Sequence, residues 1–439
     1  MTRLFARRAA LLVTILCSIV RGAPGNEAWD QLRRTGAAER QQGRYPEAKR
    51  DLEAALAQLP ADRSLRRADL EDELGSVYEF LGESAAAERT YRDAVSIVES
   101  LEAVKPDIRL AFLGDLGGFL ANRGRFKEAE AVLDRAIKGS LETLGEQDLR
   151  TAILRSTLGQ LYLLEGKLTD AEPLLKSALD VERGTLPATH LDRIAAESSL
   201  GYLYLLEGRY ERAEPILRQV SDDARRLGES HTTWAFTLSN LADLYRAEGR
   251  IARSEPLYKQ ALSIYEASLG PESLKAAETR LNMSVDYIAA KKYATAEGEV
   301  GKALEILRKI NGPDSPASAV GELRLATIYA GESRYAEAGR LLHHALPIAE
   351  STWPEGHFAV ADGLYQLAEV ERLERQYANA ELSYQKAIAV YEKCGPSGAA
   401  GLAAALRQYA MLLRTGRGDE AKALEKRAED IRKSAHAFQ

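Results

Sequence analysis

The sequence predicts an all-α solenoid of about ten helix pairs, and three observations predict it. A 14-residue pattern recurs along the chain, as in GRFKEAEAVLDRAI from residue 124 and GKLTDAEPLLKSAL from residue 166. Its first position returns at intervals of 39 to 42 residues. No segment shows the sustained period-2 alternation of a half-buried strand. A fixed period of roughly 20–50 residues is typical of folds in which similar units stack along the chain.

The composition excludes several classes of protein. Hydrophobic residues make up 45% of the 439 residues and charged residues 28%, which argues against a disordered chain, a collagen or a polytopic membrane protein. Two cysteines, Cys17 and Cys394, exclude a disulfide framework and a cysteine zinc site. The net charge is −6, whereas a duplex-binding surface needs a basic excess, so we expect no nucleic-acid partner.

Residues 1–25 are predicted to be a secretory signal. Arg3, Arg7 and Arg8 form a basic start, and the apolar run Ala9–Val20 follows. This run has 12 residues, and a bilayer-spanning helix needs about 20, so it fits a signal better than a transmembrane helix. We therefore expect an exported protein, periplasmic or secreted, with no membrane span in the mature chain.

The fate of this signal stays open at the level of sequence. Small residues favour cleavage after Gly25 or, less well, after Gly22. An uncleaved membrane anchor is the first alternative. A lipoprotein modified at Cys17 is the second, although the preceding TIL is a poor lipoprotein signal.

The first position of the pattern, called the anchor below, divides each repeat into two helices. A glycine suits it because the residue after a helix often adopts a left-handed backbone. The anchors are Gly43, Gly82, Gly124, Gly166, Gly208, Gly249, Lys291, Ser333, Arg375 and Gly416.

Small residues at two further positions are expected to let the paired helices approach closely. Five residues after the anchor the chain has alanine or serine, as in Ala48 and Ala213, and seven residues before it glycine, alanine or serine, as in Gly36 and Gly201. In the last repeat this second position is shifted by one, to Ala410. Larger apolar residues fill the remaining space, as Leu158, Tyr162, Leu175 and Leu179 do in the fourth repeat.

Tyrosines and prolines also recur in register. The tyrosines four residues before the anchor, Tyr78 to Tyr329, are expected in the core rather than in an aromatic binding stripe. Pro173, Pro215 and Pro256 share one position, which predicts that the second helix begins only shortly before it.

The repeats fill the chain after the signal. We expect one solenoid over 26–433, with a charged last helix over 419–433 as its polar cap, and a tail over 434–439. The repeats are expected at about 26–60, 65–101, 107–141, 149–183, 191–225, 232–266, 274–308, 316–350, 358–392 and 399–433.

These positions resemble the tetratricopeptide repeat (TPR), which implies a right-handed superhelix. The period of 42 exceeds the usual 34 of that family, and links such as SLGPESL at 268 resemble the long-period repeats of kinesin light chains. This chain has no N-terminal heptad coiled coil and carries an export signal. The resemblance therefore concerns the type of repeat, and we do not expect a kinesin subunit.

The resemblance also implies a ligand groove lined by the first helix of each pair. In the family, ligand-contacting positions lie roughly 13, 10, 9 and 6 residues before the anchor. The matching residues are Asp69, Asp72, Glu73, Asp115, Thr157, Ser199, Asn240, Asn282, Arg324 and Gln366. Asparagines at two of these positions match those that hold a peptide backbone in the family, since an amide both donates and accepts. The alternative is that these polar residues are only the wet side of amphipathic helices.

No segment remains for a catalytic domain, so we expect no enzyme and no cofactor. GQLYLLEGKL at 159–168 has the wrong glycine spacing for a phosphate loop. His190, His231 and His357 lie in links that are whole repeats apart, and equivalent positions of neighbouring repeats are roughly 15–20 Å apart, too far to share a metal.

The sequence thus predicts a non-catalytic, exported scaffold that binds a protein or an extended peptide. The runner-up is a regulatory or assembly arm of a separate enzyme or membrane complex, and an enzyme is the remote third. The acidic residues of the early repeats would favour a ligand with a basic end.

Overall fold

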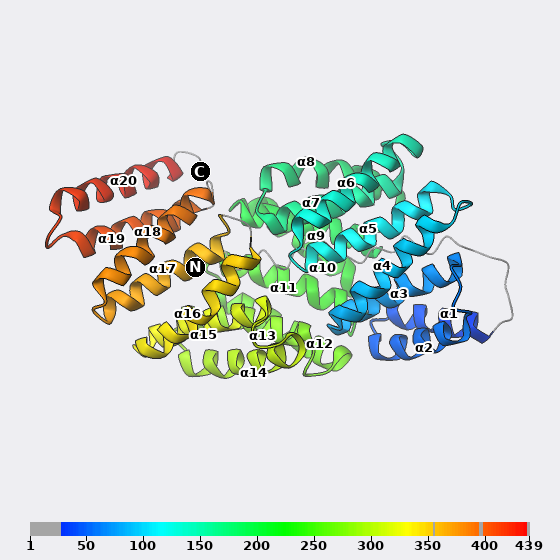
Figure 1. Cartoon of the computed structure of the whole chain (residues 1–439), viewed down its shortest axis with the longest axis horizontal. Coiled ribbons are helices and arrows are strands. Elements are labelled where there is room, and N and C mark those ends of the chain that lie inside the picture. Colours follow the sequence, from blue (N-terminus) through cyan, green and yellow to red (C-terminus); the bar gives the residue numbers. More distant parts are fainter. Residues whose placement is uncertain (1–27, 354–355, 395–397, 437–439) are drawn as a thin grey trace. The chain divides into compact units, whose positions relative to one another are not determined.

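The computed structural model describes residues 28–353, 356–394 and 398–436, which form twenty helices (Figure 1). The first helices of the pairs are α1 (Ala28–Gln41), α3 (Leu65–Leu81), α5 (Pro106–Asn122), α7 (Leu149–Glu165), α9 (Leu191–Leu206), α11 (Thr232–Ala247), α13 (Leu274–Ala289), α15 (Pro316–Gly331), α17 (Phe358–Leu373) and α19 (Ala399–Leu413). The second helices are α2 (Tyr45–Gln58), α4 (Ser84–Ser100), α6 (Phe126–Thr143), α8 (Leu168–Thr185), α10 (Tyr210–Arg225), α12 (Ile251–Leu269), α14 (Tyr293–Asn311), α16 (Tyr335–Thr352), α18 (Tyr377–Lys393) and α20 (Gly418–His436). The predicted all-α fold of helix pairs is confirmed, while the expected signal at 1–25 lies outside the described residues.

The helices form two compact units, and the division falls within α13, after Thr279. We call residues 28–279 the N-terminal unit and residues 280–436 the C-terminal unit. In both, the first helices pack against the second helices that follow them, from α1 to α11 in the N-terminal unit and from α15 to α19 in the C-terminal unit.

Close helix packing explains the small residues seven positions before the anchor. A Cβ atom built on Gly117 would lie 2.7 Å from Leu133, and one built on Gly201 would lie 2.7 Å from Leu217. Both leucines lie nine positions after the anchor and are buried. Any side chain larger than hydrogen would therefore push the paired helices apart, which confirms the predicted contact.

The anchors have the left-handed backbone that the pattern predicted. Six glycine anchors have φ between 75° and 81°, from Gly43 to Gly249. Lys291, Ser333 and Arg375 adopt φ of 55°, 63° and 65° at the same position, although they carry side chains. The geometry of the turn is therefore imposed by the repeat as a whole. Gly416 is not among the residues with positive φ, so the last turn differs.

Histidines in the links cap the first helices. His190, His231 and His357 each precede a first helix, and Nδ1 of each accepts a hydrogen bond from the backbone N–H two residues later, at 3.3, 3.1 and 3.3 Å. Asp148 caps α7 in the same place with its carboxylate. These histidines are thus N-cap residues, because each accepts a hydrogen bond from an N–H that has no partner within its helix.

The shared proline position lies near the start of the second helix, as predicted. Pro173, Pro215 and Pro256 come five residues after the first residues of α8, α10 and α12. The first i→i−4 backbone bond of these helices is donated by their fourth residue, as Ala171 donates to Lys167, so each proline removes only one of the earliest bonds. The second helices therefore begin shortly before the proline, as predicted, and tolerate the lost bond.

Candidate functional site

The groove residues of the N-terminal unit are buried. Asp69, Asp72, Glu73 and Asp115 are 5–6% exposed, and Thr157, Ser199 and Asn240 are at most 1% exposed. They lie on α3, α5, α7, α9 and α11, and from α5 to α11 each first helix contacts the next one. We call these seven the inner-face residues. Their burial rules out the wet-surface interpretation for this unit.

An arginine partly compensates the charge at the acidic end of the inner face. Arg33 on α1 donates from Nη1 to Glu73 Oε1 at 2.9 Å and to Asp69 Oδ2 at 3.5 Å. Burial nevertheless raises the pKa of Asp69 to about 7, helped by the charge of Glu73 and opposed by Arg33 and Arg40. Burial likewise raises the pKa of Glu73, against Arg40 and Arg33.

Two carboxyl groups from neighbouring first helices share a hydrogen bond in this cluster. Asp72 on α3 bonds to Asp115 on α5, and burial together with the charges of Asp115 and Asp69 raises the pKa of Asp72 well above its usual value. A carboxyl–carboxyl hydrogen bond requires a proton on one partner, because two ionised carboxylates have no donor and repel each other. The acidic end is therefore partly protonated near neutral pH.

Polar groups continue along the inner face towards α11. Thr157 and Ser199 hydrogen-bond to carbonyl oxygens of their own helices, at Ile153 and Ala195. Asn240 differs, because neither its amide nitrogen nor its amide oxygen has a hydrogen-bond partner among the described residues. A buried amide without partners costs about 1–3 kcal/mol for each group left unpaired. Asn240 is thus the inner-face residue with the greatest unused capacity to bond.

The remaining predicted site residues belong to the C-terminal unit. Asn282 on α13 is half-buried, and Arg324 on α15 is 6% exposed. Gln366 on α17 is half-buried and accepts a hydrogen bond from Thr327 Oγ1 at 2.9 Å. Gln366 therefore ties neighbouring first helices together in this structure.

Residues of the first two repeats contact residues of the sixth repeat in the N-terminal unit, and no sequence pattern predicted this contact. His231 Nε2 donates to the carbonyl oxygen of Gln41 at 2.7 Å, and the hydroxyls of Tyr45 and Thr232 are 3.4 Å apart. Phe80 at the end of α3 packs against buried Phe236 of α11. We call this set the closing contact. It joins the first and second repeats to the sixth.

Two pairs of charged residues also connect early repeats of this unit with its last repeat. Lys275, at the start of α13, interacts electrostatically with half-buried Glu79 of α3. Glu278, one turn later, interacts in the same way with Arg123 after α5. The turn ends of the early repeats therefore face the link ends of repeats four or five positions later, which is the geometry of one closed superhelical turn.

The tyrosines before the anchors serve the core. Tyr162, Tyr204 and Tyr245 donate their hydroxyls to glutamates of the preceding second helix at 3.0–3.3 Å. Arg209 and Arg250 cover the rings of Tyr204 and Tyr245 at 4.4 and 4.5 Å from the centroids. With hydroxyl and ring face both engaged, these residues join neighbouring repeats and do not form a free aromatic stripe.

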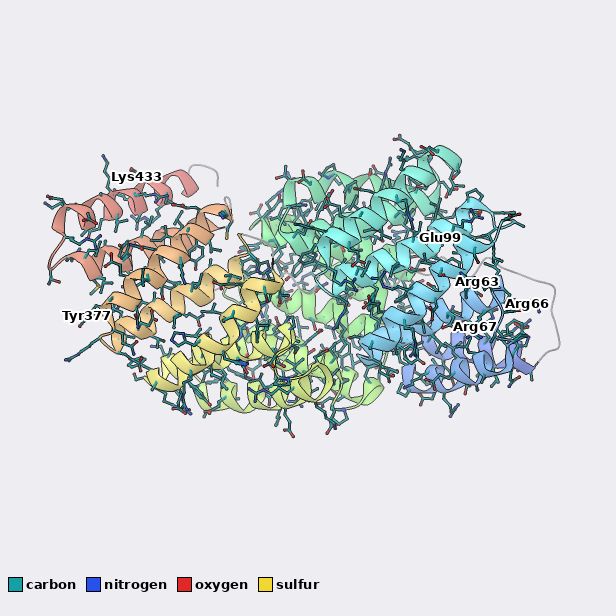
Figure 2. The ribbon with its side chains drawn as sticks, in the orientation of Figure 1. Arg63, Arg66, Arg67, Glu99, Tyr377 and Lys433 are labelled. Carbon is teal, nitrogen blue, oxygen red and sulfur yellow. The ribbon has the colours of Figure 1, made fainter. Side chains whose placement is uncertain are left out.

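The open surface of the C-terminal unit lies at its last two repeats. A cavity of about 510 Å³ is bordered by Tyr377 at the start of α18 and Met411 on α19, which are 54% and 58% exposed. Figure 2 shows Tyr377 projecting away from the ribbon. In the seventh repeat the equivalent Tyr293 packs closely on Gly331, at a position where the last repeat has Arg414. Tyr377 lacks that neighbour, so its ring is open to solvent.

The part of the chain that the structure describes contains neither a cluster of metal ligands nor a helix suited to a membrane. Its His, Cys, Asp and Glu side chains form no group of three or more placed to hold a metal ion. None of its helices is both long and apolar enough to cross a bilayer.

Comparison with solved structures finds the same fold in other proteins. A Rap protein complexed with Competence and Sporulation Factor matches with a TM-score of 0.60 at 15% identity, over 84% of this chain and 99% of that chain. The apo form of the quorum sensor NprR from B. thuringiensis matches with a TM-score of 0.53 at 15% identity, over 83% of this chain and 97% of that chain. BtubC (BKLC) from P. vanneervenii matches with a TM-score of 0.38 at 19% identity, over 56% of this chain and 94% of that chain.

The sequence itself matches one family and no individual curated protein. No curated protein matches the chain. The sequence pattern of the tetratricopeptide repeat matches residues 108–184, 192–267, 233–309 and 276–351, which together make up more than half of the chain. Ten regular helix pairs, small residues at the helix contacts and this match agree, and the chain belongs to the tetratricopeptide repeat family.

Proposed function

We propose that this protein is a non-catalytic, exported scaffold that binds an extended peptide or protein segment along the inner face of its N-terminal unit. The observation that carries the proposal is Asn240, a fully buried amide with no partner among the described residues. A peptide backbone offers both a donor and an acceptor, which is what an unpaired amide needs. A bound segment would therefore relieve a cost that the free protein bears.

The neighbouring polar groups fit the same role. The acidic cluster at α3 and α5 holds more carboxyl groups than Arg33 can compensate, which favours a basic group on the ligand. The Rap protein named above was solved in complex with a factor, so this fold can carry a bound partner. The C-terminal unit has candidate groove residues of its own, Asn282, Arg324 and Gln366.

The binding test begins with a partner recovered from a pull-down of the mature chain and identified by mass spectrometry. Asn240→Ala, alone and with Asn282→Ala, is then titrated against a synthetic segment of that partner. We expect at least about tenfold weaker binding for the double variant, because losing a buried amide contact costs about 1–3 kcal/mol. Unchanged affinity would move the binding site off the inner face.

Stability without ligand provides the matched control. Asn240→Ala should change the free energy of unfolding by less than about 1 kcal/mol, since no native hydrogen bond is lost. Asn122→Ala should cost about 1.5–3 kcal/mol, because Asn122 Nδ2 donates to the carboxylate of half-buried Glu79 at 2.6 Å. If the two substitutions cost the same in urea unfolding, Asn240 has a structural partner and the argument from its unpaired amide fails.

Export is tested separately. Expressed with its own N-terminus, the protein should lose about 22–25 residues, as expected for a signal with a short apolar core. Intact mass spectrometry of the periplasmic or secreted fraction measures the cleavage. A protein that leaves the cytosol with Arg3 still attached contradicts cleavage, and one that stays in the cytosol contradicts export.

A further inference from the structure

We propose that the closing contact is a latch, which holds the N-terminal unit shut over its inner face and opens to admit the ligand. The inference rests on the proposed function, since it concerns access to the same residues. It adds a regulated step, because the protein would bind only from the open form.

The placement of the contact makes access depend on it. Gln41 and His231 are 190 residues apart, so their hydrogen bond closes a path through six repeats. The polar inner-face residues from α7 to α11 are no more than 1% exposed in this closed form. An extended peptide cannot reach a side chain that is hidden from water, so the unit has to open before Asn240 can bind one, and the closing contact ties its first repeat to its sixth.

The contact is small enough to open. It consists of one hydrogen bond of 2.7 Å, one hydroxyl pair at 3.4 Å and the packing of Phe236 against partly buried Phe80. By contrast, the paired helices within a repeat interlock so closely that Gly201 admits no Cβ against Leu217. Opening would also separate Lys275 from Glu79, Glu278 from Arg123 and α2 from α12, and this is still fewer contacts than join the two helices of one repeat.

His231 is the residue specialised for closing. Its Nδ1 accepts from the Thr233 N–H, which leaves the proton of the neutral ring on Nε2, where it is donated to Gln41. His190 caps α9 through the same Nδ1 bond, and its Nε2 has no hydrogen bond within the described chain. Both histidines cap a first helix, and only His231 also hydrogen-bonds to a distant repeat.

The turn opposite His231 is specialised as well. A Cβ built on the anchor Gly43 would lie 3.6 Å from Thr232 Oγ1, in ordinary contact. Cβ atoms built on the anchors Gly166, Gly208 and Gly249 would meet nothing within 4 Å. Among these anchors, only that of the first repeat docks on a distant helix.

The experiment measures how often the inner face becomes accessible. Ser199→Cys, in the mature chain with Cys394→Ser, places a single thiol on the inner face, and its rate of reaction with a small maleimide reports the open population. His231→Asn keeps an N-cap oxygen but is too short to reach Gln41. We expect labelling to accelerate about tenfold, the effect of losing one hydrogen bond of about 1.4 kcal/mol.

Two controls separate opening from unfolding. His190→Asn changes the same kind of cap without touching the closing contact and should leave the labelling rate within about twofold of the parent. Thr90→Cys replaces Ser199→Cys as a reporter on α4, where Thr90 is 3% exposed and bonded to its own helix. Its labelling should not respond to His231→Asn, whereas unfolding would accelerate both reporters.

A reversible lock completes the test. Gly43→Cys with Thr232→Cys should form a disulfide, since the built Cβ of Gly43 lies 3.8 Å from Thr232 Cγ2 and other anchors tolerate side chains at positive φ. In the His231→Asn background, the oxidised lock should slow the labelling of Ser199→Cys to the parent rate, and reduction should release it.

The possible outcomes test the latch and the proposed function separately. If His231→Asn and His190→Asn label alike, or if the lock has no effect, the latch is wrong while peptide binding stands. If labelling behaves as expected but Asn240→Ala with Asn282→Ala binds the partner normally, the inner face opens for another reason and the proposed function fails.

Discussion

At the scale of single residues, the small side chains between paired helices limit what the sequence can accept. Ala213 is fully buried, and it lies on α10, the helix whose Leu217 packs against Gly201 of α9. Its neighbour Arg212 is exposed. The same register recurs in every repeat, so one substitution tests the packing of all of them.

Ala213→Leu should therefore destabilise the protein and Arg212→Ala should not. Added volume in a packed contact costs about 1–3 kcal/mol, whereas removing an exposed side chain changes stability by less than about 0.5 kcal/mol. Thermal unfolding of both variants measures the difference. Equal melting temperatures would show that α10 is rotated relative to the register described above.

Helix capping also explains why histidines recur at equivalent places in three links. The sequence showed histidines at equivalent places in three links, and spacing excluded a shared metal. The structure assigns them to helix capping, for which a residue directly before a first helix was the available signal. The second hydrogen bond of His231 could not be predicted from the sequence, because its acceptor is a backbone carbonyl 190 residues away.

At the scale of elements, the turn between paired helices sets the geometry of each repeat. Gly208 has φ of 75° and Gly416 is not among the residues with positive φ, although both are anchors. A Cβ built on either would meet nothing within 4 Å. The two positions therefore differ in backbone conformation and not in space.

Gly208→Ala is expected to destabilise the protein by about 1 kcal/mol, because alanine is strained at positive φ. Gly416→Ala should be neutral or stabilising by about 0.4–1 kcal/mol, since alanine reduces the entropy of the unfolded chain without strain. Urea unfolding of the two variants provides the comparison. A loss of stability in both would mean that the last turn is as constrained as the others.

At the scale of the whole molecule, the buried carboxyl groups make the stability of the N-terminal unit depend on pH. In the folded unit the pKa of Asp69 and that of Glu182 are raised to about 7, mainly by burial, and burial also raises the pKa of Asp72 well above its usual value. Unfolded carboxyls titrate near about 4. The folded unit thus binds more protons between these values, so its stability should fall as pH rises from about 4 to about 7.

Tryptophan fluorescence can follow this unit alone. With Trp353→Phe, the remaining tryptophans, Trp29 and Trp234, both lie in the N-terminal unit. Urea unfolding should show lower stability at pH 8 than at pH 5. Asp72→Asn replaces the protonated acid with a neutral group of similar shape and should flatten this dependence, while the exposed Asp419→Asn should leave it unchanged. A stability that rises across this range would contradict the protonated cluster.

The sequence by itself determined the repeat, its two helices, the turn between them and the side chains at their contacts. These features follow from local periodicity and from residues a few positions apart, as Gly201 and Leu217 illustrate. It also placed the inner-face residues on the first helices. Local chemistry suffices for such predictions, because each repeat contacts mainly its neighbours.

Only the tertiary structure decided that the inner face of the N-terminal unit is closed. The small rotation at each repeat interface adds up over five repeats until Gln41 meets His231, and no local pattern encodes that sum. Packing between neighbouring repeats places Asp72 beside Asp115, and Asn240 is fully buried. The sequence could therefore name the groove residues, but whether the groove is open depends on the curvature of the assembled solenoid.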